Sequence, residues 1–261
     1  MAISRATCGG SQNFLGAGWV EHLVDNSPIK VRERVALRLL SLSPHYFYDR
    51  DIRSEAERNR RSRQSLVDVL IAPYLNQSVR VLDYGCGPGY MAFAVAQRAE
   101  HVYAVDISRG VLACAKVLNG RPNITFSTPT GFGHDAEMVD LAYSFAVIQH
   151  LRTELLLGML GMIADRLRPN GVLLLHFAIP GQEGWRTEAD WAADKSIGAR
   201  IKMRYALNCF GRSADEMETL VSSCGFTHVV VRPLAGSVSV PGDDDILHQH
   251  WLTARRASND S

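Results

Sequence analysis

The sequence has almost no net charge. Its 28 Lys and Arg residues nearly balance 27 Asp and Glu residues, which leaves a net charge of +1. Because nucleic-acid binding needs concentrated cationic surface, this balance argues against nucleic acid as the main partner. The one basic cluster, Arg58–Arg63, is interleaved with Glu55 and Glu57. We interpret it as a solvated helix face, with a phosphate or carboxylate contact as the alternative.

The sequence also has few cysteines and no long apolar run. The five cysteines are scattered, and they have neither C-x-x-C nor zinc spacing. This usage is typical of a reducing compartment and predicts a cytoplasmic protein. The start of the chain lacks a signal pattern, and no apolar run approaches the ~20 residues that span a membrane. We therefore expect no membrane partner, and the oligomeric state stays open, a homodimer included.

A glycine-rich turn lies between an apolar run and a helical pattern. The turn is Asp83-Tyr84-Gly85-Cys86-Gly87-Pro88-Gly89, and it follows the strand-like run 79–82. Glycines at every second position let the backbone turn tightly and lie flat against a ligand. The helix that follows points its free N–H groups at whatever binds there. The pattern indicates a nucleotide-type site.

The details of this turn indicate which nucleotide binds. Its third glycine comes one residue too early for the dinucleotide fingerprint G-x-G-x-x-G, and no Gly-Lys-Ser/Thr follows for a P-loop. A carboxylate at Asp83 would repel a pyrophosphate but suits an ammonium group. Asp106 ends the next apolar run, where an acid can accept both ribose hydroxyls. An ammonium group, a ribose and no phosphate together describe S-adenosylmethionine.

With these residues the chain resembles the class I S-adenosylmethionine-dependent methyltransferases that act on small molecules. Asp83-x-Gly85-x-Gly87-x-Gly89 matches that family's first motif, and Asp106 matches its second-strand acid. The segments 140–151 and 167–175 look like its fourth-strand motif and its turn into the fifth strand. The alternative is a glycine loop without a ligand, and the number of matches in family order argues against it.

The resemblance implies a fold and a cofactor site. The fold is α/β: a Rossmann-like, doubly wound, mostly parallel seven-stranded sheet with an antiparallel last strand, a helical N-terminal cap and a lid insertion. The expected cofactor-binding residues are Asp83, Gly85, Cys86, Gly87, Gly89, Asp106, Ile107, Thr130 and Phe145. The family often holds the adenine amino group with an acid after the third strand, but here no acid precedes Asp135. Backbone groups, the Thr130 hydroxyl or stacking near Phe132 are the alternatives.

The spacing of apolar residues predicts the elements of such a fold. Strands are expected at 79–83, 102–106, 123–127, 139–145, 171–177, 228–233 and 248–255. Helices are expected at 64–75, 89–98, 109–119, 153–168 and 213–224. Ser108, Thr153 and Ser213 are the predicted N-caps, and Gly120 and Gly225 the predicted helix ends.

The pattern also predicts the organisation of the chain. The expected parts are an N-terminal cap, 1–65, and a methyltransferase domain, 66–261, with a lid insertion at 178–212. Adjacent aromatics at 46–48 suit a cap that closes over a ligand, or equally one that packs on the sheet edge. The insertion carries Trp185, Trp191 and several basic residues, and it is long for a connection. We expect it to act as a lid or substrate wall.

Candidate catalytic residues lie at the expected ends of strands. Aromatic faces stabilise a sulfonium charge, and the candidates are Phe47, Tyr143, Phe145 and Trp185. A hydroxyl acceptor needs a base, and His150 is the leading candidate because it follows the fourth strand and a histidine titrates near neutral pH. The alternative is a histidine that braces the loop. His176 ends the fifth strand and is the second candidate, or else a core histidine bonded to backbone.

The remaining candidates carry less weight. His45 and His134 are further possible bases, and Asp49 is a base or metal ligand if the cap folds over the site. The run 243–245, with His248 and His250, leaves a divalent cation open, although a solvated acidic turn is the preferred interpretation.

We predict O-methylation of a small polar acceptor, such as a sugar or another hydroxylated metabolite. The aromatic and basic residues of the insertion suit such an acceptor, because rings stack on the apolar faces of sugars. N-methylation of a small amine is one alternative. A non-catalytic S-adenosylmethionine-binding protein of the same fold is the other.

Overall fold

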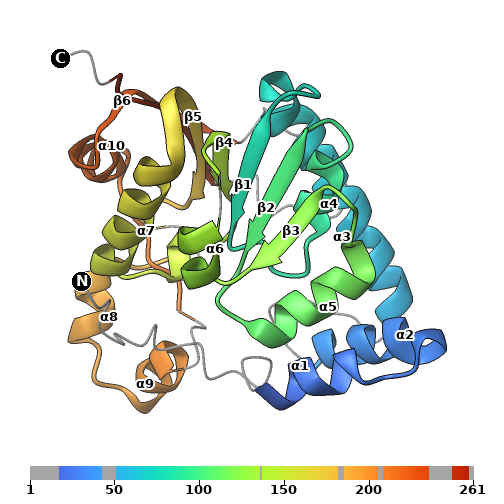
Figure 1. Ribbon diagram of the computed structural model, residues 1–261. Coiled ribbons are helices and arrows are strands. Elements are labelled where there is room, and N and C mark those ends of the chain that lie inside the picture. Colours follow the sequence, from blue (N-terminus) through green and yellow to red (C-terminus); the bar gives the residue numbers. More distant parts are fainter. Residues whose placement is uncertain are drawn as a thin grey trace.

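The computed structural model describes residues 18–42, 51–135, 137–181, 185–204, 208–234 and 249–258. Its centre is a seven-stranded sheet in the order β3-β2-β1-β4-β5-β7-β6, with β7 antiparallel to both neighbours (Figure 1). The strands are β1(Arg80–Tyr84), β2(His101–Val105), β3(Ile124–Ser127), β4(Val139–Ser144), β5(Leu167–Phe177), β6(Phe226–Pro233) and β7(His250–Arg256). The predicted Rossmann-like sheet is confirmed.

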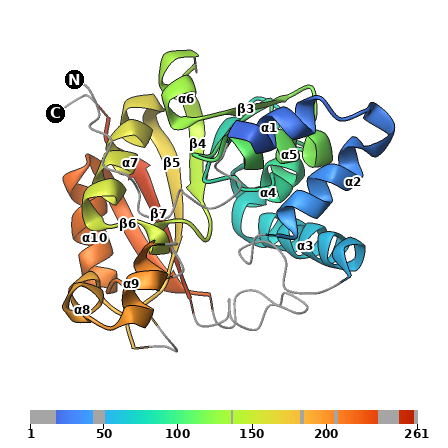
Figure 2. The same cartoon turned by 90° about the horizontal axis from the view of Figure 1, so that it is seen from below.

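Helices cover both faces of the sheet. They are α1(Gly18–Asp25), α2(Ile29–Leu40), α3(Ile52–Leu66), α4(Tyr90–Val95), α5(Arg109–Asn119), α6(Pro129–Asp135), α7(Thr153–Arg166), α8(Glu188–Ala193), α9(Ile197–Arg204) and α10(Ala214–Ser223). Short helical turns are η2(Val67–Ile71), η3(Ala72–Tyr74) and η4(Ile148–His150). Figure 2 shows α3, α4 and α5 on one side of the sheet and α6, α7 and α10 on the other. Helices α1 and α2 pack on the outside of α5.

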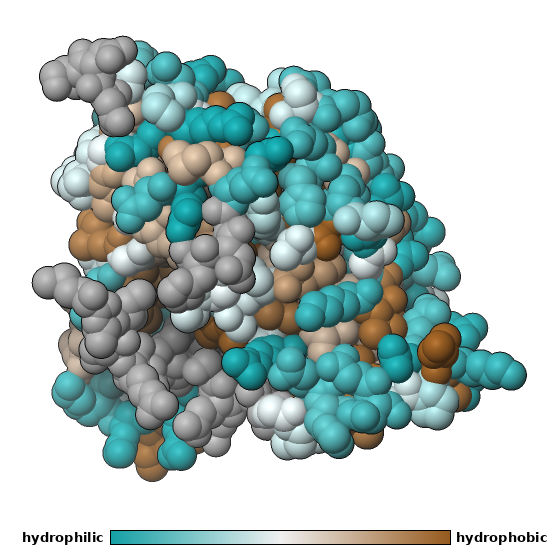
Figure 3. All heavy atoms as spheres, in the orientation of Figure 1, coloured by the Kyte–Doolittle hydropathy of each residue, from teal (hydrophilic) through white to brown (hydrophobic). Residues whose placement is uncertain are grey.

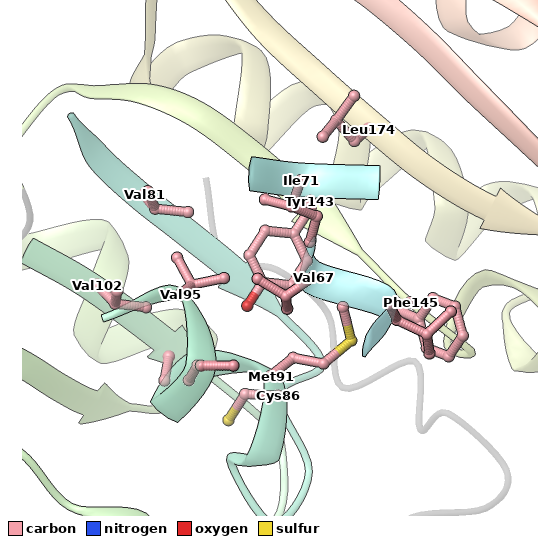
Figure 4. Packing of buried hydrophobic residues seen from close by; sticks show 14 of the residues in the cluster. Val67, Ile71, Val81, Cys86, Met91, Val95, Val102, Tyr143, Phe145 and Leu174 are labelled. Carbon is pink, nitrogen blue, oxygen red and sulfur yellow. The ribbon is translucent and has the colours of Figure 1, made fainter. Parts of the chain in front are cut away.

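Two apolar layers hold these helices to the sheet. The side chains of Val81 and Tyr143 point into one layer, under α3 and α4, and Figure 4 shows Tyr143 in the middle of it. Those of Leu82 and Ala142 point into the other layer, against α6 and α7. Strands buried on both faces in this way carry near-continuous apolar runs, which is why the sequence pattern located them.

The largest difference from the predicted elements is at α3. This helix begins at Ile52 rather than at residue 64, and the Asp51 side chain caps it by accepting from the N–H groups of Arg53 and Ser54. Its sequence is mostly polar, so apolar spacing gave no signal there. The helix continues into η2 without a break, so the predicted boundary at residue 65 lies inside one helical segment.

Smaller differences have local causes. Strand β5 begins at Leu167 rather than 171, because an irregularity in its pairing with β4 accommodates Asn170 at a φ of 62°. Helix α6 was not predicted. The N-caps Ser108 and Ser213 are confirmed, since they accept from the N–H groups of Val111 and Glu216.

The surface of the described residues is mixed. Figure 3 shows hydrophilic residues over much of the face seen in Figure 1, interrupted by hydrophobic ones. None of the helices in the described part of the chain is long and apolar enough to cross a membrane.

Candidate active site

The glycine turn joins β1 to α4 at the carboxyl edge of the sheet. Gly85, Gly87 and Gly89 all have left-handed φ angles, of 80°, 51° and 81°. A Cβ on Gly85 would lie 2.2 Å from Val147 Cγ2, and one on Gly89 would lie 3.1 Å from the Phe126 ring. Conformation and space both require glycine at these positions. The result is a close backbone cradle in front of the α4 N-terminus.

Asp106 ties this cradle to the end of β2. Its Oδ2 accepts the Gly87 N–H at 3.0 Å, and its Oδ1 accepts the Ser108 N–H at 2.9 Å. A carboxylate oxygen has a second lone pair, so both oxygens can still accept hydroxyl groups. Ile107, beside Asp106, is 52% exposed and adds an apolar surface at the same edge.

Asp83 lies on β1, directly before the turn, and is 2% exposed. The pKa of its carboxyl is raised to about 7, mainly by burial and also by the charge of Asp106, against the lowering effect of the Tyr143 hydroxyl and the Ala92 N–H. Its Oδ2 has no hydrogen-bond partner among the described residues. A buried acid of this kind gains its charge most readily beside a cation. Cys86 is also buried, which raises the pKa of its thiol far above the ordinary value, so we assign it a packing role.

These features fit S-adenosylmethionine. The cradle leaves no room for side chains, an acid with spare lone pairs ends β2, and an incompletely paired carboxyl lies beside the turn. The ligand would place its ribose at Asp106, its adenine near Ile107 and its ammonium group on the Asp83 side of the turn.

The expected adenine contacts after β3 need correction. Phe132 is 1% exposed and packs edge-on against Tyr103, with ring centroids 5.6 Å apart. It is part of the core, which argues against stacking of adenine on its ring. Thr130 is exposed in the first turn of α6 and stays a candidate.

The candidate aromatics on β4 differ in their position. Tyr143 is 0% exposed in the centre of the core, which contradicts a role at the sulfonium. Phe145 is 8% exposed and lies at the edge of the same cluster (Figure 4). The guanidinium carbon of Arg63, from α3, lies 5.5 Å from the centre of its ring. The solvated-face interpretation of the basic cluster is therefore wrong for Arg63.

His150 ends η4, just after β4. Its Nδ1 is 3.0 Å from the carbonyl oxygen of Asn208, in the insertion. Because a carbonyl only accepts, Nδ1 must carry the proton, and the lone pair is on Nε2. The residue therefore braces the insertion through one nitrogen while its other nitrogen has the form that a base requires.

His176, at the end of β5, is 1% exposed. Its Nδ1 accepts the Ala146 N–H at 3.2 Å, and its ring stacks on Phe145 with centroids 4.3 Å apart. Burial, with the nearby charges of Arg63 and His250, lowers the pKa of the imidazole to about 3. The only lone pair of the neutral ring is thus already in use, so the prediction of His176 as a base is wrong. The alternative of a core histidine bonded to backbone is confirmed.

The insertion is anchored to the segment between β4 and α7 by residues that the sequence did not single out. The Arg212 side chain, 3% exposed, donates to the carbonyl oxygens of Ile148 (3.1 Å) and Leu151 (2.5 Å). Glu188 Oε2 accepts both the N–H and the hydroxyl of Thr153, at 2.8 and 2.9 Å. Thr153 is therefore the first residue of α7 rather than its N-cap, and that prediction is wrong. No local pattern signals either contact.

The predicted tryptophans have different surroundings. Trp191 is 5% exposed and forms a small core with Ala199 and Phe210, so it is not a substrate wall. Trp185 is partly exposed.

Several candidates lie outside the described residues. They are His45, Phe47, Asp49, Asp243, Asp244, Asp245 and His248, together with the side chain of His134. The residues that the structure describes contain no group of three or more His, Cys, Asp or Glu side chains that could hold a metal ion. In that part of the chain Cys86, Cys114, Cys209 and Cys224 are free cysteines.

Comparisons with known proteins agree with this geometry. Residues 81–171 match the family described as "Methyltransferase domain". A malonyl-(acyl-carrier protein) O-methyltransferase of Salmonella typhimurium is 32% identical over 97 residues, which is 37% of this chain and 39% of that protein. The chain thus matches well under half the length of this curated relative.

Solved structures share the fold. Magnesium protoporphyrin IX methyltransferase from Synechocystis, with bound S-adenosylhomocysteine, has a TM-score of 0.53 at 19% identity, over 85% of this chain and 93% of that one. A Haemonchus contortus phosphoethanolamine N-methyltransferase has a TM-score of 0.53 at 16% identity, over 76% and 52%. The fold is that of the class I S-adenosylmethionine-dependent methyltransferases, and residues 81–171 match the methyltransferase-domain family.

Proposed function

We propose that this protein transfers the methyl group of S-adenosylmethionine to an oxygen atom of a small polar acceptor. The observation that carries the proposal is the joining of Gly87 to Asp106, which puts a glycine cradle and a ribose-type acid in one place. His150 follows β4 at the same edge of the sheet, with its lone pair on Nε2.

The bound S-adenosylmethionine would supply an electrophilic methyl group on a positively charged sulfur. Transfer of this methyl group would form a carbon–oxygen bond and break the carbon–sulfur bond, whose electron pair would go to sulfur, and the acceptor hydroxyl would have to lose its proton. His150 Nε2 accepts that proton, and the Nδ1–H bond to Asn208 holds the ring in the required tautomer. The residues of the turn align the donor, which is the main task of the protein in such a displacement.

The acceptor is proposed from the chemistry of the insertion and of Arg63 on α3, which lies near Phe145. Arg63 and the partly exposed Trp185 provide a charge and a ring, which suit a hydroxylated molecule such as a sugar. N-methylation of a small amine is the nearest alternative and does not need a base of the same strength. The similar proteins include both O-methyltransferases and an N-methyltransferase by name, so they do not decide between the two acceptors.

Cofactor binding is tested by calorimetry with S-adenosylhomocysteine. Asp106→Ala removes the acceptor of the Gly87 N–H and of the ribose, and we expect the affinity to fall by roughly 100-fold, since hydrogen bonds to a charged group are worth about 1.5–3 kcal/mol each. Asp165→Ala, on the exposed side of α7, is the matched control. Unchanged affinity in Asp106→Ala would contradict the ribose assignment.

The reaction is tested by S-adenosylhomocysteine formation with panels of hydroxyl and amine acceptors. His150→Ala should lower turnover on a hydroxyl acceptor by at least ~100-fold, which is the usual contribution of a general base. Normal turnover in His150→Ala would show that the residue only braces the insertion. A wild-type protein that binds the cofactor but methylates no acceptor favours the non-catalytic alternative.

We propose a small molecule as the partner, rather than nucleic acid or a membrane, because of the near-zero net charge. A divalent cation, a homodimer and a cytoplasmic location stay predictions. Turnover after chelation and light scattering of the purified protein test the first two.

A further inference from the structure

The turn after β4 has an unusual backbone at Ala146. This residue has a φ of 57°, in the left-handed region that non-glycine residues avoid. Such a conformation costs on the order of 1 kcal/mol and persists only where surrounding contacts impose it. The contact that the structure provides is the hydrogen bond of the Ala146 N–H to His176 Nδ1, at 3.2 Å.

The position of this turn matters for both parts of the active site. Val147, the residue directly after Ala146, makes both connections. Its side chain fills the space in front of Gly85, where an added Cβ would lie 2.2 Å from Val147 Cγ2. Its carbonyl accepts the His150 N–H at 2.8 Å, so the turn leads directly into the segment that holds the candidate base. A shift at Ala146 would therefore reach the glycine turn and His150 together.

His176 is suited to hold the turn because its state cannot easily change. Its ring is stacked on Phe145 at an interplanar angle of 28°, which fixes the direction of Nδ1. The charged and titratable groups that face it are Arg63 on α3 and His250 on β7, and together with burial they lower its pKa to about 3. The imidazole thus stays neutral, and Nδ1 stays an acceptor, throughout the range in which proteins work.

We propose that His176 is a positioning residue, whose Nδ1 holds Ala146 in its left-handed conformation and so sets the β4 turn against the glycine turn. The inference rests on the proposed function only in that the glycine turn binds S-adenosylmethionine. It gives the second histidine of the carboxyl edge a role without proton transfer, and it separates that role from the role of His150.

Four variants test the proposal: His176→Phe, His176→Asn, Ala146→Gly and the double variant His176→Phe/Ala146→Gly. Phenylalanine keeps a ring on Phe145 but cannot accept the Ala146 N–H. The Oδ1 of asparagine lies near the place of Nδ1 and can accept it. Glycine adopts a φ near 57° without strain, so it lowers the need for the hydrogen bond.

The first measurement is the affinity for S-adenosylhomocysteine. Loss of one hydrogen bond predicts roughly a tenfold weaker affinity for His176→Phe. His176→Asn should stay within about threefold of wild type, since it restores the acceptor. Ala146→Gly in the His176→Phe background should recover at least half of the loss on a logarithmic scale. Equal loss in the Phe and Asn variants, or no recovery with glycine, would overturn the proposal.

The second measurement needs no ligand. The thermal stabilities of wild type, His176→Phe, Ala146→Gly and the double variant form a double-mutant cycle, and the effect of His176→Phe should be smaller when residue 146 is glycine. Equal effects in the alanine and glycine backgrounds reject the positioning role even if the cofactor proposal holds. If wild type binds no S-adenosylhomocysteine, the proposed function fails, and the stability cycle still decides whether His176 holds the turn.

Discussion

The two halves of the carboxyl edge are built in different ways. On the cofactor side, the turn from Asp83 to Gly89 is held by backbone shape and by Asp106, which is 19 residues from Gly87 in the sequence. On the acceptor side, the segment from Ala146 to Thr153 is held by side chains of residues 30 to 64 positions away and by the backbone carbonyl of Asn208. The cofactor side is thus encoded locally. The acceptor side depends on contacts between residues far apart in the sequence.

The largest loss of cofactor affinity is expected at Gly85, where the backbone and the surrounding space allow no side chain. Gly85→Ala would push a Cβ against Val147 and strain a φ of 80°, so we expect S-adenosylhomocysteine affinity to fall by at least ~100-fold and the melting temperature to drop. Gly158→Ala, on α7 with open space around it, is the control and should leave binding unchanged. Binding within threefold of wild type in Gly85→Ala would mean that Val147 and the turn move apart freely.

A change on the acceptor side should lower stability and turnover but leave the affinity for S-adenosylhomocysteine nearly unchanged. Arg212→Met leaves the carbonyl groups of Ile148 and Leu151 without their buried donor, so we expect a loss of about 3 kcal/mol in the free energy of unfolding and a large fall in turnover. S-adenosylhomocysteine affinity should change by less than threefold. Arg200→Met, exposed on α9, is the control. A strong loss of cofactor affinity in Arg212→Met would contradict the separation of the two halves.

The buried acid of the cofactor side makes the stability of the protein depend on pH. The pKa of Asp83 is about 7 in the folded protein and 3.8 in the unfolded reference, so between these values the folded protein keeps a proton that the unfolded chain has released. Wild-type stability therefore falls as pH rises through this window and levels off above pH 7. One pKa unit corresponds to about 1.4 kcal/mol, which makes the penalty at pH 8 on the order of 4 kcal/mol.

Asp83→Asn should recover a part of that penalty. Denaturant titrations should find it more stable than wild type at pH 8, with a much smaller difference at pH 4. Its affinity for S-adenosylhomocysteine should be lower, because the carboxylate that would face the ammonium group is lost. Asp165→Asn, on the surface of α7, should behave as wild type at both pH values. If Asp83→Asn is less stable than wild type at pH 8 and binds S-adenosylhomocysteine equally tightly, Asp83 is not part of the cofactor site.

The sequence predicted the sheet and the cofactor turn because both depend on short-range patterns. Apolar runs located β1, β2 and β4, and the left-handed angles of Gly85, Gly87 and Gly89 leave a spacing that is visible in the sequence. The N-caps Ser108 and Ser213 were visible for the same reason.

Local sequence patterns did not indicate the start of α3, the cap of α7 or the tautomers of the two histidines. The first turns of α3 bury polar side chains, such as that of Glu55, which is 2% exposed. The spacing of apolar residues therefore does not indicate that the helix begins at Ile52. The sequence around Thr153 and the sequence around Glu188 do not indicate the cap that Glu188 provides, because the two residues come together only in the folded chain. The tautomers of His150 and His176 follow from what each nitrogen faces, and that is a property of the packing.

The anchoring of the insertion has a consequence for protein engineering. Arg212, Glu188 and Asn208 end on groups of the segment 148–153, so the unit that can be exchanged between homologous scaffolds is larger than the insertion itself. A chimera that receives only residues 178–212 would present Arg212 and Glu188 to a recipient segment whose carbonyl, N–H and hydroxyl groups are not positioned to meet them. Transplanting 148–153 together with the insertion moves a complete set of donors and acceptors, and acceptor preference should travel with that pair of segments.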